Sequence, residues 1–117
     1  MNDRLEFAKK LEYRTIQFAI KIIHLSALLG NSPEQKVIRN QLIKSGTSIG
    51  ANYREANRSR SKADFKNKIK ICLSEACEVQ YWLEILKELK WGNAMNEELV
   101  KESGELVALF TSISKKL

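Results

Sequence analysis

The stretch SKADFKNKIKICLSEACEVQYWLEILKEL, residues 61–89, carries a sustained helical pattern. Apolar or small residues recur in it at alternating spacings of four and three, at Phe65, Ile69, Cys72, Ala76, Val79, Leu83 and Leu86. This spacing is the heptad seam of a helix that packs against other helices. Ser61 is a suitable N-cap with Asp64 three positions later, and Gly92 is placed to end the helix.

A second row runs beside this seam on the same predicted helix. Its members are Ile71, Glu75, Glu78, Trp82, Ile85 and Leu89. A helix in a four-helix bundle needs only one apolar face, so the extra row has two interpretations. It widens the core face against two neighbouring helices, or it is buried in an interface between copies of the chain. The pattern favours the oligomer interface.

The preceding segment opens with a clear start signal. Ser32 is an N-cap, Pro33 takes the first helical position, and Gln35 completes a capping box. Residues 45–51, SGTSIGA, have poor helix propensity, and they form either a loop or a helix whose small residues admit a close neighbour. We predict a helix because the apolar stripe keeps its phase across the stretch.

Two further amphipathic segments flank these. The first spans about residues 3–28, with Asp3 as a candidate N-cap and Gly30 as a candidate C-terminal residue, and it is apolar on more than one side. The last begins near Asn93 or Asn96 and runs to the end. Short connections between long helices make antiparallel neighbours. We therefore predict an all-α, up-down-up-down antiparallel four-helix bundle that forms one domain over residues 1–117.

Length and composition agree with this fold. The chain has 117 residues, with only five Gly and one Pro, which disfavours an architecture of many short strands. Cys72 and Cys77 cannot build a disulfide framework or a four-ligand zinc site, and we expect buried thiols in a reducing compartment. The charged N-terminus lacks the apolar run of a signal peptide, and no apolar run could span a bilayer. We expect a cytoplasmic protein without membrane contact.

Positive charge is concentrated around residues 54–70. This window has a net charge of +5, against +6 for the whole chain, and its basic residues are Arg54, Arg58, Arg60, Lys62, Lys66, Lys68 and Lys70. In the predicted bundle, both termini lie at the same end as this window. That end therefore also receives Arg4, Lys9, Lys10, Lys115 and Lys116.

Two interpretations of this cluster compete: a solvated, like-charged helix end, and a surface that binds phosphates. Lys62 and Lys66 stand in the first turns of a predicted helix, where the helix dipole disfavours cations. A purely structural pattern would avoid that placement, so the anion-binding interpretation is favoured. Phe65 is the one aromatic residue in the window and belongs to the seam. We therefore expect contacts to the nucleic-acid backbone, without base stacking or sequence preference.

Catalysis and metal binding have little support in the sequence. His24 is the single histidine, whereas a di-iron site in a helical bundle needs Glu-x-x-His pairs. Glu55, Glu75 and Glu78 are better explained as partners of Arg or Lys, in the same subunit or a neighbouring one. We expect no enzyme activity, no metal and no cofactor.

The central part of the chain resembles a known family. The similarity lies in SGTSIGANYREA at residues 45–56, SKADF at 61–65, EACE at 75–78 and YWL at 81–83. These residues are similar to the bacterial four-helix-bundle proteins first noticed as reading frames inside 23S rRNA intervening sequences. The accessory variability determinant of diversity-generating retroelements is a relative of that family. The resemblance implies a homopentameric ring with a basic surface, and that relative binds its reverse transcriptase and nucleic acid.

Together these features predict a non-enzymatic homo-oligomer, five-membered by resemblance. Its basic end is expected to bind the phosphate backbone of RNA or DNA without sequence specificity, with a reverse transcriptase or another protein as a further partner. The alternative is an oligomeric protein-interaction scaffold that does not bind nucleic acid and whose charge only keeps it in solution.

Overall fold

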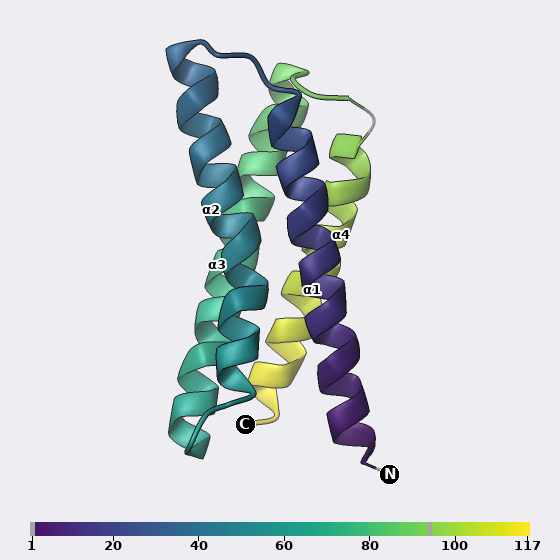
Figure 1. Ribbon diagram of the computed structural model, residues 1–117, viewed down its shortest axis with the longest axis vertical. Coiled ribbons are helices and arrows are strands. Elements are labelled where there is room, and N and C mark those ends of the chain that lie inside the picture. Colours follow the sequence, from purple (N-terminus) through teal and green to yellow (C-terminus); the bar gives the residue numbers. More distant parts are fainter. Residues whose placement is uncertain (1, 94) are drawn as a thin grey trace.

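The computed structural model describes residues 2–93 and 95–117, which fold into four helices and no strands (Figure 1). The helices are α1 (Asp3–Ala27), α2 (Pro33–Ala56), α3 (Lys62–Leu89) and α4 (Met95–Lys115). Consecutive helices run in opposite directions and lie along the long axis of a body measuring 47 × 24 × 20 Å. This arrangement confirms the predicted antiparallel four-helix bundle.

The up-down topology determines which connections lie at each end of the bundle. Both termini and the α2–α3 turn lie at one end, and the α1–α2 and α3–α4 connections lie at the other (Figure 1). We call the first the basic end and define it by residues 2–12, 54–70 and 113–117. Its three segments are far apart in the sequence but are neighbours in space.

The core is built around the seam of α3. The seam residues Ile69, Cys72, Ala76, Val79, Leu83 and Leu86 are all fully buried. Phe65, at the basic end, is half-buried and packs against the core. Helix α3 packs mainly on α2 and α4, and α1 closes the bundle by inserting Phe18, Ile22 and Leu25. The heptad prediction is therefore confirmed.

The helix starts are predicted better than the helix ends. Ser32 forms its capping box with Gln35, and the Ser61 side chain accepts a hydrogen bond from the Asp64 amide at 3.1 Å. The Asp3 prediction is wrong, because the Asn2 side chain caps α1 instead. Gly30 and Gly92 do not end helices either. The C-cap of α1 is Leu28, whose backbone keeps the right-handed helical conformation. The C-cap of α3 is Lys90, whose backbone is in the left-handed helical region with φ 59°.

Residues 45–51 are helical, as predicted, and their small side chains bring α1 and α2 together. A Cβ atom at Gly46 would lie 2.9 Å from Cγ2 of Ile22, and one at Gly50 would lie 2.8 Å from Oγ1 of Thr15. The hydroxyl of Ser48 donates to a carbonyl one turn earlier in α2, which satisfies it without breaking the helix. Poor intrinsic propensity is thus offset by close packing.

Ion pairs also join helices α1 and α4. Arg14 donates to both carboxylate oxygens of Glu102 at 2.7 Å and to Glu105 at 2.8 Å. The hydrogen bond with Glu102 raises the pKa of the Arg14 guanidinium above its ordinary value. Lys21 pairs with Glu98 at 2.6 Å one step further along. In the part of the chain that the structure describes, the ion pairs between α1 and α4 involve Arg14 and Lys21, and none involves residues 2–12 of the basic end.

The two cysteines differ from the expectation that both are buried. Cys72 lies in the seam, and burial raises the pKa of its thiol to about 12. Cys77 is exposed, because five residues of helix rotate it to the opposite side of α3.

The α1–α2 contact can be tested with glycine substitutions. Gly46→Val should lower the free energy of unfolding by about 1–3 kcal/mol, because its methyl groups have no space beside the buried Ile22 side chain. Gly104→Ala in α4 is the control, since the nearest atom to a new Cβ is the flexible end of Gln80 at 3.3 Å. This change should leave stability unchanged or raise it by about 0.5–1 kcal/mol. Urea denaturation of both variants distinguishes packing from helix propensity, and equal effects would contradict this account.

The cysteine environments predict a difference in reactivity with a disulfide reagent in non-denaturing buffer. Cys77 should react within minutes, whereas Cys72 should react only as the protein unfolds, because the thiolate is the reactive form. The Cys77→Ser variant should therefore show no fast phase, and Cys72→Ser should retain it. A fast phase from Cys72 would show that the seam opens readily.

Candidate nucleic-acid interface

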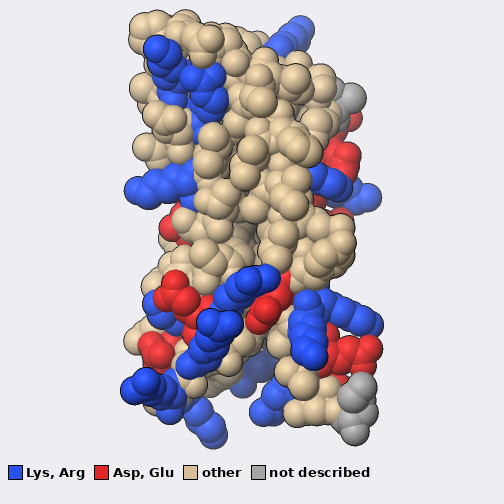
Figure 2. Space-filling model, in the orientation of Figure 1, with Lys and Arg blue, Asp and Glu red and all other residues tan. Residues whose placement is uncertain are grey.

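The predicted basic residues occupy the end of α2, the α2–α3 turn and the start of α3. Arg54 is on the last turn of α2, Arg58 and Arg60 are in the turn, and the four lysines follow on α3. All are exposed except Lys68, which is half-buried. Figure 2 shows Lys and Arg side chains gathered toward the lower part of the molecule, where the basic end lies, with acidic side chains interspersed.

The structure divides this cluster into paired and unpaired side chains. Lys68 pairs with Glu55 at 2.8 Å, and this bond raises the pKa of the Lys68 ammonium. Arg54 lies 3.8 Å from Glu12. In the part of the chain that the structure describes, no carboxylate lies within 4.0 Å of the other members, which are Arg58, Arg60, Lys62, Lys66 and Lys70.

Helical spacing explains the division. Lys62, Lys66 and Lys70 are four residues apart and share one side of α3. Lys68 is on the side that faces α2, where Glu55 meets it. Arg54 and Lys68 are therefore engaged within the protomer, and the stripe on α3 is free to meet an external anion.

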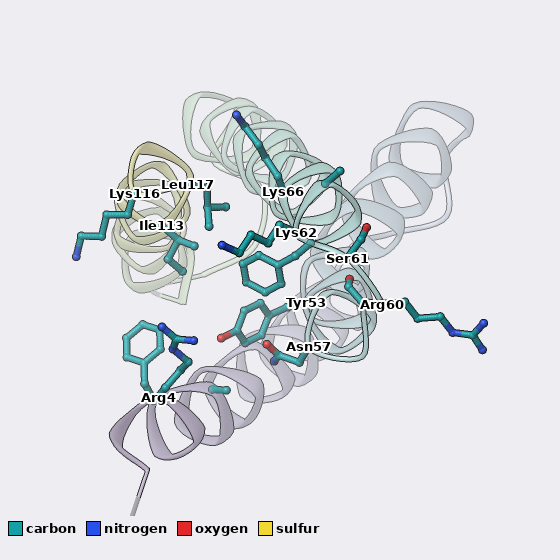
Figure 3. A pocket seen from close by; sticks show the side chains of 15 residues that line it. Arg4, Tyr53, Asn57, Arg60, Ser61, Lys62, Lys66, Ile113, Lys116 and Leu117 are labelled. Carbon is teal, nitrogen blue, oxygen red and sulfur yellow. The ribbon is translucent and has the colours of Figure 1, made fainter.

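A groove opens at the basic end between the start of α1, the α2–α3 turn and the end of α4 (Figure 3). Its volume is about 1020 Å³. The basic side chains that line it are Arg4, Arg60, Lys62, Lys66 and Lys116, and no acidic residue is among the described residues that line it. Of the seven basic residues predicted from the sequence, the groove includes Arg60, Lys62 and Lys66.

The groove also has an apolar and aromatic lining that the sequence analysis did not assign to a site, although it identified Phe65 as a seam residue. The residues concerned are Phe7, Ala8, Tyr53, Phe65, Ile113 and Leu117. They come from all four helices, so no local window of sequence contains them. Only the topology, which brings the first and last turns of the chain together, could have pointed to Phe7 and Leu117.

Tyr53 forms part of the groove floor. Its ring is almost fully buried and packs edge-to-face on Phe110, with 5.6 Å between the ring centroids. Its hydroxyl is directed into the groove beside the side chain of Asn57 (Figure 3). Burial raises the pKa of Tyr53, so the hydroxyl remains protonated at neutral pH and can act as a hydrogen-bond donor.

The predicted interface row on α3 is only partly covered in the protomer. Ile71 is 40% exposed and Leu89 is 46% exposed, Glu78 is exposed, and Trp82 and Ile85 are half-buried. Glu75 is half-buried and has no ion pair among the described residues. Its pKa is raised mainly by desolvation and, to a smaller extent, by the negative charge of the neighbouring Glu78. The indole N–H of Trp82 is buried and has no acceptor in the described part of the chain.

Helix α1 also exposes apolar residues on the side opposite its buried row. They are Leu5, Tyr13, Ile20 and Ile23. The buried row and this outer row together explain why α1 is apolar on more than one side.

Residues 2–93 and 95–117 contain neither a candidate metal site nor a candidate membrane-spanning helix. No group of three or more His, Cys, Asp or Glu side chains is placed there to hold a metal ion. None of the described helices combines the length and hydropathy needed to cross a membrane.

The fold and groove define a class: an antiparallel four-helix bundle with a cationic groove at the end that holds both termini. The chain belongs to the 23S rRNA-intervening sequence protein family, whose family model matches residues 8–112. The family resemblance expected from the sequence is thereby confirmed. No match is found among curated proteins.

A solved structure supports this assignment. It is a crystal structure of a protein of unknown function from the S23 ribosomal protein family of Bacteroides thetaiotaomicron. The two chains are 40% identical, the match covers 92% of this chain and 97% of that one, and the TM-score is 0.82. The bundle architecture is thus common to both proteins.

Proposed function

We propose that this protein binds nucleic acid at its basic end, through phosphates and without sequence specificity, and that it acts by binding rather than by catalysis. The observation that carries this proposal is the gathering of unpaired cations around one groove whose described lining contains no Asp or Glu side chain. Charges of one sign in a concave site attract a polyanion, and each phosphate contact releases condensed counterions.

The position of the lysines on α3 gives further support. Lys62 is the first residue of the helix and Lys66 is in its second turn, where the aligned peptide dipoles are unfavourable for cations. Asp64 is the only acidic residue in that first turn. A phosphate placed there would be favoured by both the lysines and the helix N-terminus, so binding would relieve a local repulsion.

We further propose that the chain acts as a homo-oligomer, five-membered by resemblance to the family. The support is the apolar surface left exposed on α1 and on the α3 row, which a monomer would present to water. A ring would place several basic ends on one particle, and such multivalency would strengthen weak phosphate contacts. An accessory role beside a nucleic-acid enzyme such as a reverse transcriptase fits this arrangement.

The binding proposal predicts a specific salt dependence. In the triple variant Arg58→Gln, Lys62→Gln, Lys66→Gln, affinity for RNA and DNA should fall for every sequence alike. The slope of log K against log salt should flatten by about 0.7–0.9 for each phosphate that the variant no longer binds. Fluorescence anisotropy over a salt series measures both effects.

The matched control changes the same number of charges at the opposite end. Lys36→Gln, Lys87→Gln, Lys90→Gln alters exposed residues near the α1–α2 and α3–α4 connections. This control should reduce affinity much less and keep the slope. Equal effects of the two triple variants would mean that net charge matters and the basic end does not. If neither the wild type nor the variants bind at low salt, the interaction-scaffold function would be favoured.

The assembly proposal predicts that light scattering will give a mass several times the protomer mass of 13.4 kDa, and five times for a pentamer. Ile71→Glu with Leu89→Glu should shift the mass toward the protomer, because burying unpaired carboxylates costs several kcal/mol. Both residues are exposed in the protomer, so its fold should persist. Val37→Glu on α2, at a residue 59% exposed, is the control and should leave the mass unchanged. A monodisperse wild-type monomer at micromolar concentration would contradict the proposal.

A further inference from the structure

The groove at the basic end combines positive charge with aromatic surface. Phe7 from α1, Tyr53 from α2 and Phe65 from α3 line the same space as Arg4 and Lys62. Phe7 is 47% exposed, although it lies beside the mouth of an otherwise well-packed bundle. An exposed aromatic ring among cations suits a ligand that is both flat and anionic.

We propose that this groove holds an unpaired stretch of a nucleic-acid strand, with a base stacked on Phe7 and a phosphate bound by Arg4 and Lys62. The inference rests on the proposed function and adds to it a preference for unpaired bases. It departs from the expectation of no base stacking, which considered only the aromatic residue within 54–70, because Phe7 and Tyr53 also line the groove. The exposed lysines of the α3 stripe, such as Lys66 and Lys70, would bind the phosphates of any nucleic acid. The groove would select strands whose bases are not already paired.

The side chains at the centre of the groove converge. The guanidinium of Arg4, the ammonium of Lys62 and the hydroxyl of Tyr53 are directed toward the space between α1, α3 and α4 (Figure 3). Each is a hydrogen-bond donor, and a phosphate oxygen accepts from all three kinds of group. The three groups come from three helices, so the bundle itself holds the donor set in place.

The remaining cations point elsewhere, which favours a strand over a compact anion. Arg60, Lys66 and Lys116 line the groove but are directed away from its middle (Figure 3). A single headgroup would leave them unused, whereas successive phosphates of a strand that leaves the groove could meet them in turn. The volume of about 1020 Å³ is at the upper end of the range of about 300–1,000 Å³ usual for ligand sites.

A duplex cannot stack its bases on the aromatic side chains of the groove. Its bases are already stacked on one another and present only their edges in the grooves. A duplex also carries more charge per unit length than a single strand, so charge alone would favour the duplex. A preference for single strands would therefore report the aromatic contact and not the cations.

The test compares three short mixed-sequence probes of equal length: a single strand, its duplex, and an abasic strand that keeps the phosphates but has no bases. The wild-type protein should bind the single strand more tightly than either of the others. Phe7→Leu keeps the apolar volume but removes the ring, and it should weaken single-strand binding by between about 5- and 100-fold. Its affinity for the duplex and the abasic strand should not change.

Tyr81→Leu is the matched control, because Tyr81 is an exposed aromatic residue on α3 outside the groove. It should leave all three affinities unchanged. If all probes bind equally well and Phe7→Leu has no effect, the groove inference fails while the proposed phosphate binding stands. If no probe binds at low salt, both fail.

Two further arms identify the source of the anion. RNA and DNA versions of the single strand establish whether the ribose matters, and a loss of affinity on Phe7→Leu in either one supports the inference. Vesicles of phosphatidylcholine and phosphatidylserine test a lipid instead. If such vesicles bind, compete with the strand and lose affinity on Phe7→Leu while strand binding does not, the groove takes a lipid and the inference is overturned.

Discussion

The burial of the α3 seam is the interaction on which the rest of this structure depends. Ile69, Val79, Leu83 and their neighbours on the seam are removed completely from water, and α3 forms the main contacts with both α2 and α4. The hydrophobic effect is roughly proportional to the apolar area buried, so a seam of this length fixes the helices side by side. Short connections then leave antiparallel neighbours as the available topology, and this topology places both termini beside the α2–α3 turn.

That placement has an electrostatic consequence. Three segments with unpaired cations meet at one end, where Arg4, Lys62 and Lys116 line a common groove. Farther along the bundle, Arg14 pairs with Glu102 and Glu105, and Lys21 pairs with Glu98, between α1 and α4. Exposed ion pairs contribute only about 0–1 kcal/mol each, so leaving cations unpaired costs the fold little. The same cations remain available to an external polyanion.

The fold was predictable from local patterns, and the groove was not. The heptad of α3, the capping box at Ser32 and the phase of the stripe through residues 45–51 each depend on neighbours in sequence, and the structure agrees with all of them. Helix ends were predicted less well, because glycine is only one of several ways to end a helix, as Leu28 and Lys90 show. The basic half of the site was visible as a charge cluster. Phe7 and Tyr53 were missed because they meet Phe65 only through packing between helices.

The central claim is that the basic end, and not the bundle as a whole, meets nucleic acid. Amide hydrogen exchange with and without a saturating single strand tests it most directly, because the method reports protection along the entire backbone. We predict slower exchange in the first turns of α1, in residues 54–70 and in the last turn of α4, with no change around the α1–α2 and α3–α4 connections. Protection confined to those connections, or to the exposed outer side of α1, would contradict it.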